Sequence, residues 1–174
     1  MPSRIFGLMD MAYRVKKPGK RIQRSLYEVF DDVVTALRKR KVPFMLHGAW
    51  ALAAYGYERA TMDVDFLVPR DEKTLSAVFD IMKELRAIPI RGGPQNAEQA
   101  LARHSRHVQF YLFGWEVDFF PDPDFAKLAK RKGRRKVGDH VVPIIAAKDL
   151  KARKLERGMD QDIVDVRRLE AAEE

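Results

Sequence analysis

The stretch LHGAWALAAYGYERATMDVDFLVP, residues 46–69, sets two aspartates into an apolar run. Asp63 and Asp65 alternate with Val64 and Phe66, and this period of two predicts a half-buried β-strand. Such a strand projects both carboxylates from one face and places the apolar side chains in the core. Buried carboxylates need a partner for their charge. Two of them side by side suit a hard divalent cation, which takes oxygen ligands.

A third carboxylate occurs in WEVDFF, residues 115–120, where Asp118 alternates with Val117 and Phe119. If this strand lies beside the first, three carboxylates converge. Two metal ions about 4 Å apart in such a cluster are the usual apparatus for phosphoryl or nucleotidyl displacement. The alternative is that the aspartate pair only satisfies backbone amides or arginines such as Arg59.

A glycine turn precedes the first aspartate strand. Gly48 follows an apolar run and begins a short alanine-rich segment, Ala49 to Tyr55, that suits a helix. A glycine there lets a phosphate approach the backbone, and a helix start offers free N–H groups and a positive dipole end. The sequence therefore predicts a phosphate site and a metal site on adjacent pieces of one unit.

The composition bounds the class of protein. A chain of 174 residues, 46% of them hydrophobic, suits one domain, or one domain with an appended helical piece. The absence of cysteine excludes disulfides, thiolate metal sites and a cysteine nucleophile. Neither a signal-peptide core nor a run of membrane-spanning length occurs, so we expect a cytoplasmic protein with no membrane partner.

The formal net charge of +8 is unevenly distributed. Residues 1–41 and residues 127–136 are each strongly basic, and the remainder is acidic. Such stretches attract phosphate backbones, although a solvated surface is the alternative. The candidate RNA-binding residues are Lys130, Arg131, Lys132, Arg134, Arg135 and Lys136.

Periodicity and turn signals predict three parts: a basic arm (1–22), a core (23–146) and a C-terminal helical segment packed on the core (147–174). Ser25 and Glu28 form a capping-box pattern before the first helix. Helices are predicted over 25–40, 49–55, 71–86, 96–104 and 147–172, with an interruption at Gly158, and strands over 42–46, 61–68, 87–90, 107–113, 115–120 and 140–145. This alternation predicts an α/β fold, a mixed sheet flanked by helices.

Other candidate residues are given structural roles. DQDIVD, residues 160–165, repeats the aspartate spacing within a predicted helix, where positions i and i+2 diverge by about 200°. We interpret it as a solvated face. His104 and His107 straddle a helix end, so a metal pair is not expected, and His47 is interpreted as a core or edge residue. Trp50, Trp115 and the aromatics of FYLF (110–113) are assigned to the core.

The stretch from Leu46 to Val68 resembles the signature of the nucleotidyltransferase superfamily related to DNA polymerase beta. In that family an apolar strand leads to a Gly-Gly or Gly-Ser turn, a helix, and an Arg-x-Ser/Thr-x-Asp-x-Asp strand. The matching positions are Gly48, Arg59, Thr61, Asp63 and Asp65, and EVDFF resembles the strand of the third carboxylate, Asp118. Ala49 departs from the pattern: it keeps its backbone N–H but lacks the serine hydroxyl.

The segment KDLKARKLERGMDQDIVDVRRL, residues 148–169, resembles the C-terminal part of standalone prokaryotic members. These include abortive-infection and toxin–antitoxin nucleotidyltransferases, in which a lysine lies near the nucleotide phosphates. The matching positions are Lys154 and Asp162.

The resemblance implies an enzyme that moves a nucleoside monophosphate from an NTP to an acceptor hydroxyl and releases pyrophosphate. Asp63, Asp65 and Asp118 are then catalytic residues that hold two Mg²⁺ ions, with Mn²⁺ as an alternative. The nucleotide-binding residues are Gly48, Ala49, Arg59, Thr61 and Lys154.

The acceptor stays open. RNA, particularly a tRNA end, suits the basic stretches and the toxin-like resemblance, which also implies a cognate toxin or antitoxin partner. A protein hydroxyl is the second choice and an antibiotic-like small molecule the third. A non-catalytic nucleotide- or RNA-binding protein on the same scaffold is the alternative from another class.

Overall fold

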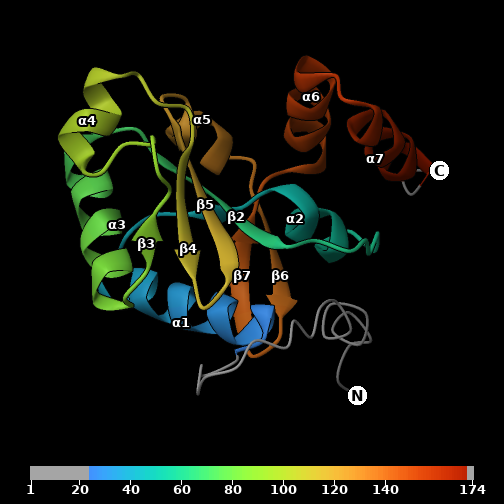
Figure 1. The fold of residues 1–174 in the computed structure, drawn as a ribbon. Helices are drawn as coiled ribbons and strands as arrows, with labels where there is room; N and C mark the ends of the chain where they lie inside the picture. The colour runs from blue at the N-terminus through green and yellow to red at the C-terminus, as the bar shows by residue number, and fades with distance from the viewer. Residues whose placement is uncertain (1–23, 172–174) are drawn as a thin grey trace.

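The computed structural model describes residues 24–171, so the predicted basic arm, residues 1–22, lies outside the described residues. The centre is a seven-stranded sheet in the order β3-β4-β5-β2-β1-β7-β6 (Figure 1). The strands are β1 (Met45–Leu46), β2 (Asp63–Pro69), β3 (Ile88–Pro89), β4 (Val108–Leu112), β5 (Trp115–Asp122), β6 (Gly133–Val137) and β7 (His140–Ile144). The pairs β2–β5 and β1–β7 are parallel and the others antiparallel. The predicted mixed sheet is confirmed.

The predicted helices are present within a few residues of their expected bounds, and one short helix, α5, was not predicted. They are α1 (Leu26–Lys39), α2 (Gly48–Ala54), α3 (Glu72–Glu84), α4 (Ala97–Ala102), α5 (Phe125–Ala129), α6 (Ala147–Arg157) and α7 (Asp160–Ala171). Ser25 and Glu28 form the capping box of α1, and Asp71 caps α3. Gly158, in the left-handed conformation, ends α6. None of the described helices has the length and apolar character needed to cross a membrane.

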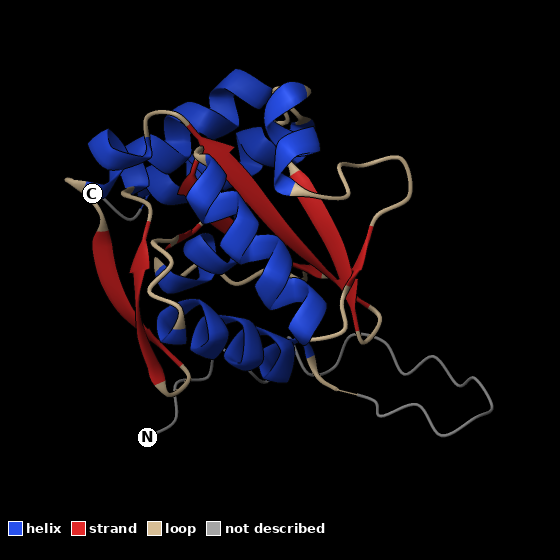
Figure 2. Ribbon diagram, turned by 90° about the vertical axis from the view of Figure 1, so that its left-hand side faces the viewer, coloured by secondary structure: helices blue, strands red, loops and turns tan. Residues whose placement is uncertain are grey.

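The strand period sorts the core into two clusters. Val64, Phe66 and Val68 of β2 belong to a large cluster with buried residues of α1 and α3. Leu67, which points to the other face, belongs to a second cluster with residues of α2, α5, α6 and α7, including Leu150 and Leu169. Figures 1 and 2 show the helices on the sheet, with α3 and α4 at the opposite side of the molecule from α6 and α7. The aspartates of β2 therefore face the second set of helices.

Three local predictions differ from the structure. Only Met45 and Leu46 of the predicted strand 42–46 are in a strand. The basic stretch contains an unpredicted edge strand, β6, which pairs with β7. The assignment of FYLF to the core is wrong for Tyr111 and Phe113, each 41% exposed, because the strand alternates its faces and the hairpin turn lies outside the sheet.

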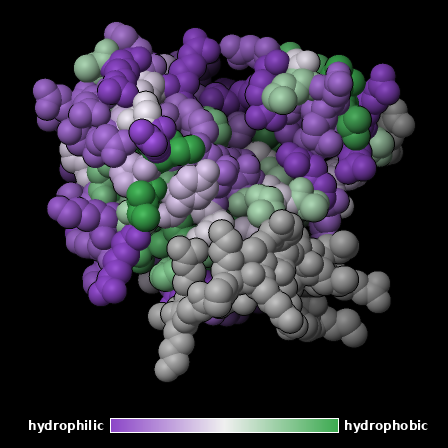
Figure 3. All heavy atoms as spheres, in the orientation of Figure 1, coloured by the Kyte–Doolittle hydropathy of each residue, from purple (hydrophilic) through white to green (hydrophobic). Residues whose placement is uncertain are grey.

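The C-terminal helices expose an apolar surface. Figure 3 shows a mostly hydrophilic face with hydrophobic residues at upper right, over α6 and α7. The exposed hydrophobic residues there are Leu155, Met159, Ile163 and Val164. Leu150 of α6 and Leu169 of α7 face the core, so each of these helices packs one face against the rest of the protein.

Candidate active site

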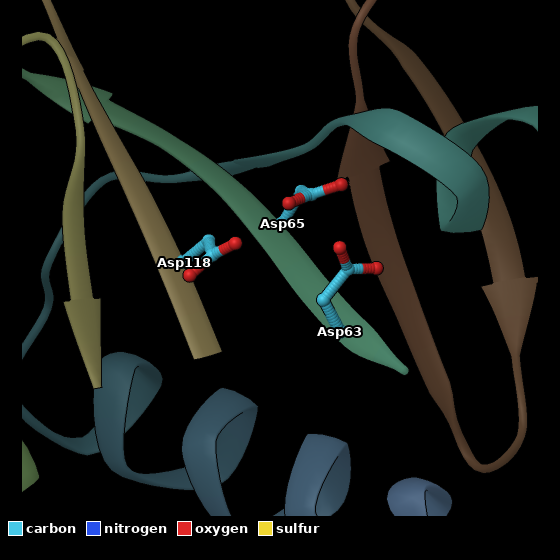
Figure 4. Close-up of side chains that lie close together, drawn as sticks. All are labelled: Asp63, Asp65 and Asp118. Carbon is cyan, nitrogen blue, oxygen red and sulfur yellow. The ribbon is translucent and has the colours of Figure 1, made fainter. Parts of the chain in front are cut away.

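The three predicted carboxylates come together on the sheet. Strands β2 and β5 run parallel in a register that pairs Asp65 with Asp118 and Asp63 with Glu116. Figure 4 shows Asp63, Asp65 and Asp118 on one face, and one oxygen from each lies within 4.8 Å of the others. The expected convergence of the two strands is confirmed.

Gly48 allows the close approach of the turn to Asp65. Its φ is +59°, and a Cβ at this position would lie 1.6 Å from Asp65 Oδ2. The backbone N–H of His47 donates to the Asp65 carbonyl oxygen at 3.0 Å, which fixes the turn against β2. Any side chain at Gly48 would displace the carboxylate, so this glycine is required by the acidic cluster itself.

No lysine or arginine of the described residues forms an ion pair with the three carboxylates. Within residues 24–171, Asp63 and Asp65 have no ion pair, and Asp118 has one, between its Oδ1 and His107 Nε2 at 3.2 Å. Burial, followed by the charges of Asp63 and Asp118, raises the pKa of Asp65 to about 8. A cluster that repels its own charge in this way fits a divalent cation.

One neighbour orients the cluster. The Thr61 hydroxyl donates to Asp63 Oδ1, so this predicted nucleotide-binding residue acts on a carboxylate. Asp118 is 4% exposed, and its Oδ1 has no hydrogen bond among the described residues. Asp118 raises the pKa of the neighbouring His107 imidazole, and a divalent cation would supply further positive charge to this buried carboxylate. The residues present therefore fit a metal site.

An aromatic stack, defined by His47, Phe120 and His107, lies beside the carboxylates. The rings of His107 and Phe120 are parallel within 4°, with centroids 4.8 Å apart, and His47 stacks on Phe120 at 5.4 Å. His107, considered from the sequence only as a metal pair with His104, was given no role in the site. Counting back from the hairpin at Gly114 would have found it, since Leu112 pairs with Trp115 and this register brings His107 beside Phe120.

Positive charge lies on the Gly48 side of the site. Burial, together with the nearby charges of Arg153, Lys154 and Arg157, lowers the pKa of His47 to about 3. Since His47 directly precedes Gly48, these residues of α6 lie near the predicted phosphate turn, where Arg153 pairs with Asp122 and Arg157 with Asp162. Arg153 and Arg157 were not among the predicted site residues, although they lie one helical turn apart with Lys154 between them.

Lys154 and Arg59 lie in a separate network with the aspartates of α7. Lys154 is 3% exposed, and its Nζ donates to Asp162 at 3.3 Å and to Asp165 at 2.7 Å. Arg59 Nε lies 3.5 Å from Asp165 Oδ2. The interpretation of residues 160–165 as a solvated face is wrong, because Asp162 and Asp165 are fully buried. The contact between α6 and α7 encloses them, and Lys154 compensates their charge.

The other flank of Asp118 is acidic and polar. Glu116 is on the same strand face as Asp118, since the two are separated by one residue. It accepts hydrogen bonds from Gln109 Nε2 at 2.8 Å and from the Tyr111 hydroxyl at 3.2 Å. The strand period of two, which predicted that Asp63 and Asp65 share a face, also predicts that Glu116 shares a face with Asp118.

The basic stretch lies far from the carboxylates. Strand β6 is three strands from β2 and four from β5, about 14 Å and 19 Å at about 4.8 Å per strand. Arg131 forms a two-pronged contact with Asp149, and Arg135 lies over the Tyr55 ring. Arg134 and Lys136 alternate with Arg135, so they point to the opposite face. The stretch does not present one continuous basic face.

Neither a protein-family model nor a curated protein matches the sequence. Solved structures do. The antibiotic-resistance factor ANT(2'')-Ia matches with a TM-score of 0.63 at 12% identity, over 82% of this chain and 80% of that one. The lincosamide antibiotic adenylyltransferase LnuA, bound to lincomycin, matches with a TM-score of 0.59 at 12% identity, over 86% and 99%.

A candidate nucleotidyltransferase from Thermotoga maritima also matches, with a TM-score of 0.57 at 15% identity, over 82% of this chain and 90% of that one. The chain therefore has the nucleotidyltransferase fold, as the sequence resemblance predicted. At these identities the similarity establishes the fold, and the chemistry has to be argued from the site.

Proposed function

We propose that the protein is an enzyme, a divalent-metal-dependent nucleotidyltransferase that moves a nucleoside monophosphate from an NTP to an acceptor hydroxyl. The observation that carries the proposal is the cluster of Asp63, Asp65 and Asp118 on this fold, converging without a lysine or arginine partner in residues 24–171. Three carboxylates that converge without such a partner are suitable ligands for Mg²⁺ or Mn²⁺, which would supply the positive charge.

Each residue has a role in this proposal. Asp63 and Asp65 would hold a divalent ion whose charge offsets that of the triphosphate, and Asp118 would complete the metal site on the acceptor side. Bound ions of this kind neutralise phosphate charge and activate the attacking hydroxyl. In the proposed reaction the acceptor oxygen bonds to the α-phosphorus as the bond to pyrophosphate breaks, and Asp118 takes the hydroxyl proton. Thr61 keeps Asp63 in its orientation.

The triphosphate is assigned to the Gly48 side. Residue His47, at the N-cap of α2, makes no side-chain capping bond, so the N–H groups of Gly48 and Ala49 are the proposed phosphate contacts. Arg153 and Arg157 add positive charge there. Lys154 and Arg59 contact the buried aspartates of α7, and these contacts hold α6 against α7 beside the proposed triphosphate site. A direct contact of Lys154 or Arg59 with the nucleotide stays a prediction.

The acceptor that the charge of the site favours is a small molecule carrying hydroxyl and amino groups. Glu116 beside Asp118 attracts cations and repels a phosphate chain, while Gln109 and Tyr111 offer hydrogen-bonding groups. Among the similar structures, LnuA is described with lincomycin and ANT(2'')-Ia with adenylyl-2''-tobramycin, which agrees in chemistry with this proposal.

Labelling decides the reaction and its acceptor. Each α-³²P NTP is incubated with Mg²⁺ and, separately, with RNA, a protein lysate and a panel of amino sugars. We expect label on the amino sugars, lost in Asp65→Asn and retained in Asp80→Asn, a matched change at an exposed aspartate of α3. Mg²⁺-dependent NTP binding with no labelled product in any pool would favour the non-catalytic binding protein.

RNA is the second candidate, supported by the basic stretch. If Arg134 and Lys136 contact an RNA backbone, their replacement by Gln should flatten the salt dependence of RNA binding by about 0.7 per contact for single strands. The same charge change at Arg167 and Arg168, exposed on α7, is the control. Equal slopes of log affinity against log salt for wild type and variant, measured by filter binding, would indicate that the basic stretch is a solvated surface. A protein acceptor and a toxin or antitoxin partner stay predictions.

A further inference from the structure

His107 and Asp118 place a nitrogen and an oxygen, both possible metal ligands, close together. His107 Nε2 lies 3.2 Å from Asp118 Oδ1, yet that oxygen is buried and has no hydrogen bond among the described residues. The distance is therefore short while the direction of the N–H is poor. This contact satisfies neither group fully.

The spacing fits two ligands of one ion. Adjacent ligand atoms of an octahedral ion with bonds of about 2.1 Å lie about 3 Å apart. Asp118 also lies in the carboxylate cluster, where one oxygen each of Asp63, Asp65 and Asp118 lie within 4.8 Å of one another. Phe120 holds the His107 ring flat, with His47 also stacked on Phe120, so the imidazole is oriented before any ion binds.

We infer that His107 is a protein ligand of the ion on the acceptor side of the site, together with Asp118. This inference rests on the proposed function, because it completes the same metal centre. A nitrogen ligand among carboxylates favours borderline transition-metal ions such as Mn²⁺, Co²⁺ or Zn²⁺ over Mg²⁺. The ion near Asp63 keeps an oxygen-only set, so the two positions would differ in metal preference.

Pulsed electron paramagnetic resonance on protein loaded with Mn²⁺ alone tests the ligand directly. We expect ¹⁴N coupling from an imidazole in the wild type and its loss in His107→Phe, which keeps a ring to stack on Phe120 but has no ligand atom. His104→Phe, at another exposed histidine, should keep the coupling. Nitrogen coupling that survives His107→Phe would overturn the inference.

Metal affinity gives a second readout that does not depend on turnover. Mn²⁺ binding to His107→Phe, measured by calorimetry, should weaken about tenfold or more, the scale seen when metal-site residues are removed. His107→Asp restores an oxygen ligand and should shift the preference from Mn²⁺ towards Mg²⁺. Unchanged Mn²⁺ affinity in His107→Phe would refute the inference while leaving the proposed function intact. A wild type that binds no Mn²⁺ would refute both.

Discussion

Two parts of the molecule carry aspartates with the same spacing and opposite electrostatics. On β2, Asp63 and Asp65 share a strand face with Asp118 beside them, and neither has an ion pair within residues 24–171. On α7, Asp160 and Asp162 have the same spacing, but Asp160 is exposed and Asp162 is fully buried against Lys154 and Arg157. The secondary structure decides which side chains meet.

The compensation of charge separates the two clusters. Burial and the neighbouring carboxylates raise the pKa of Asp65 to about 8. Burial also opposes ionisation of Asp162, but the hydrogen bonds and charge of Arg157, with those of Lys154, outweigh it and hold the pKa below its usual value. A buried carboxylate with an internal partner holds the fold together, whereas one without a partner is available to an external cation.

The largest expected effect is on catalysis at the uncompensated cluster. Asp63→Asn and Asp65→Asn should each lower nucleotidyl transfer by about a thousandfold or more, since a lost ligand removes several kcal/mol of transition-state stabilisation. Neither should lower the free energy of unfolding in the absence of metal, because each removes repulsion. Labelled-NTP assays and urea unfolding measure both. Transfer at wild-type rate in both variants would remove the site assignment.

The compensated cluster should respond in the opposite way. Asp162→Asn should lower the free energy of unfolding by about 3 kcal/mol or more, since it leaves Lys154 buried with one partner fewer. Asp160→Asn, at the exposed aspartate of the same helix, should change it by less than about 0.5 kcal/mol. Urea unfolding of the two variants compares them, and equal losses would contradict the distinction.

Divalent metal should stabilise the protein only through the cluster of Asp63, Asp65 and Asp118. At ten times its Kd, Mn²⁺ should raise the free energy of unfolding by about 1.4 kcal/mol, provided that the unfolded chain does not bind it. Asp162→Asn should keep this increment and Asp118→Asn should lose most of it. Thermal unfolding with and without Mn²⁺ measures the increments. An increment that Asp118→Asn retains in full would place the ion elsewhere.

The smallest effect is the pH dependence of the stability that Asp162 contributes on α7, because this dependence is confined to acid pH. Since the folded-state pKa of Asp162 lies below the unfolded value of about 3.9, its stabilisation is present above that pH and is lost as pH falls through the folded pKa. The difference in unfolding free energy between wild type and Asp162→Asn should therefore shrink below about pH 4. A difference that stays constant to pH 2 would contradict the lowered pKa.

Much of the fold was predictable from local patterns. The capping box of α1, the end of α6 at Gly158 and the alternation of β2 and β5 are properties of short segments, and the structure confirms them. The strand in the basic stretch was not predictable in this way, because Gly133 to Val137 carries few apolar residues and pairs with β7 through long-range contacts. Tertiary pairing overrides a weak local preference.

The candidate site divides in the same manner. The sequence by itself determined that Asp63 and Asp65 share a face and that Asp118 projects from a similar strand, because strand period is a local property of the backbone. Only the tertiary structure decided that Asp118 pairs with Asp65, that His107 lies against Asp118, and that Asp162 and Asp165 enclose Lys154. These contacts depend on strand register and on helix packing between segments that are distant in the sequence. The burial that results then shifts the pKa values of the carboxyl groups.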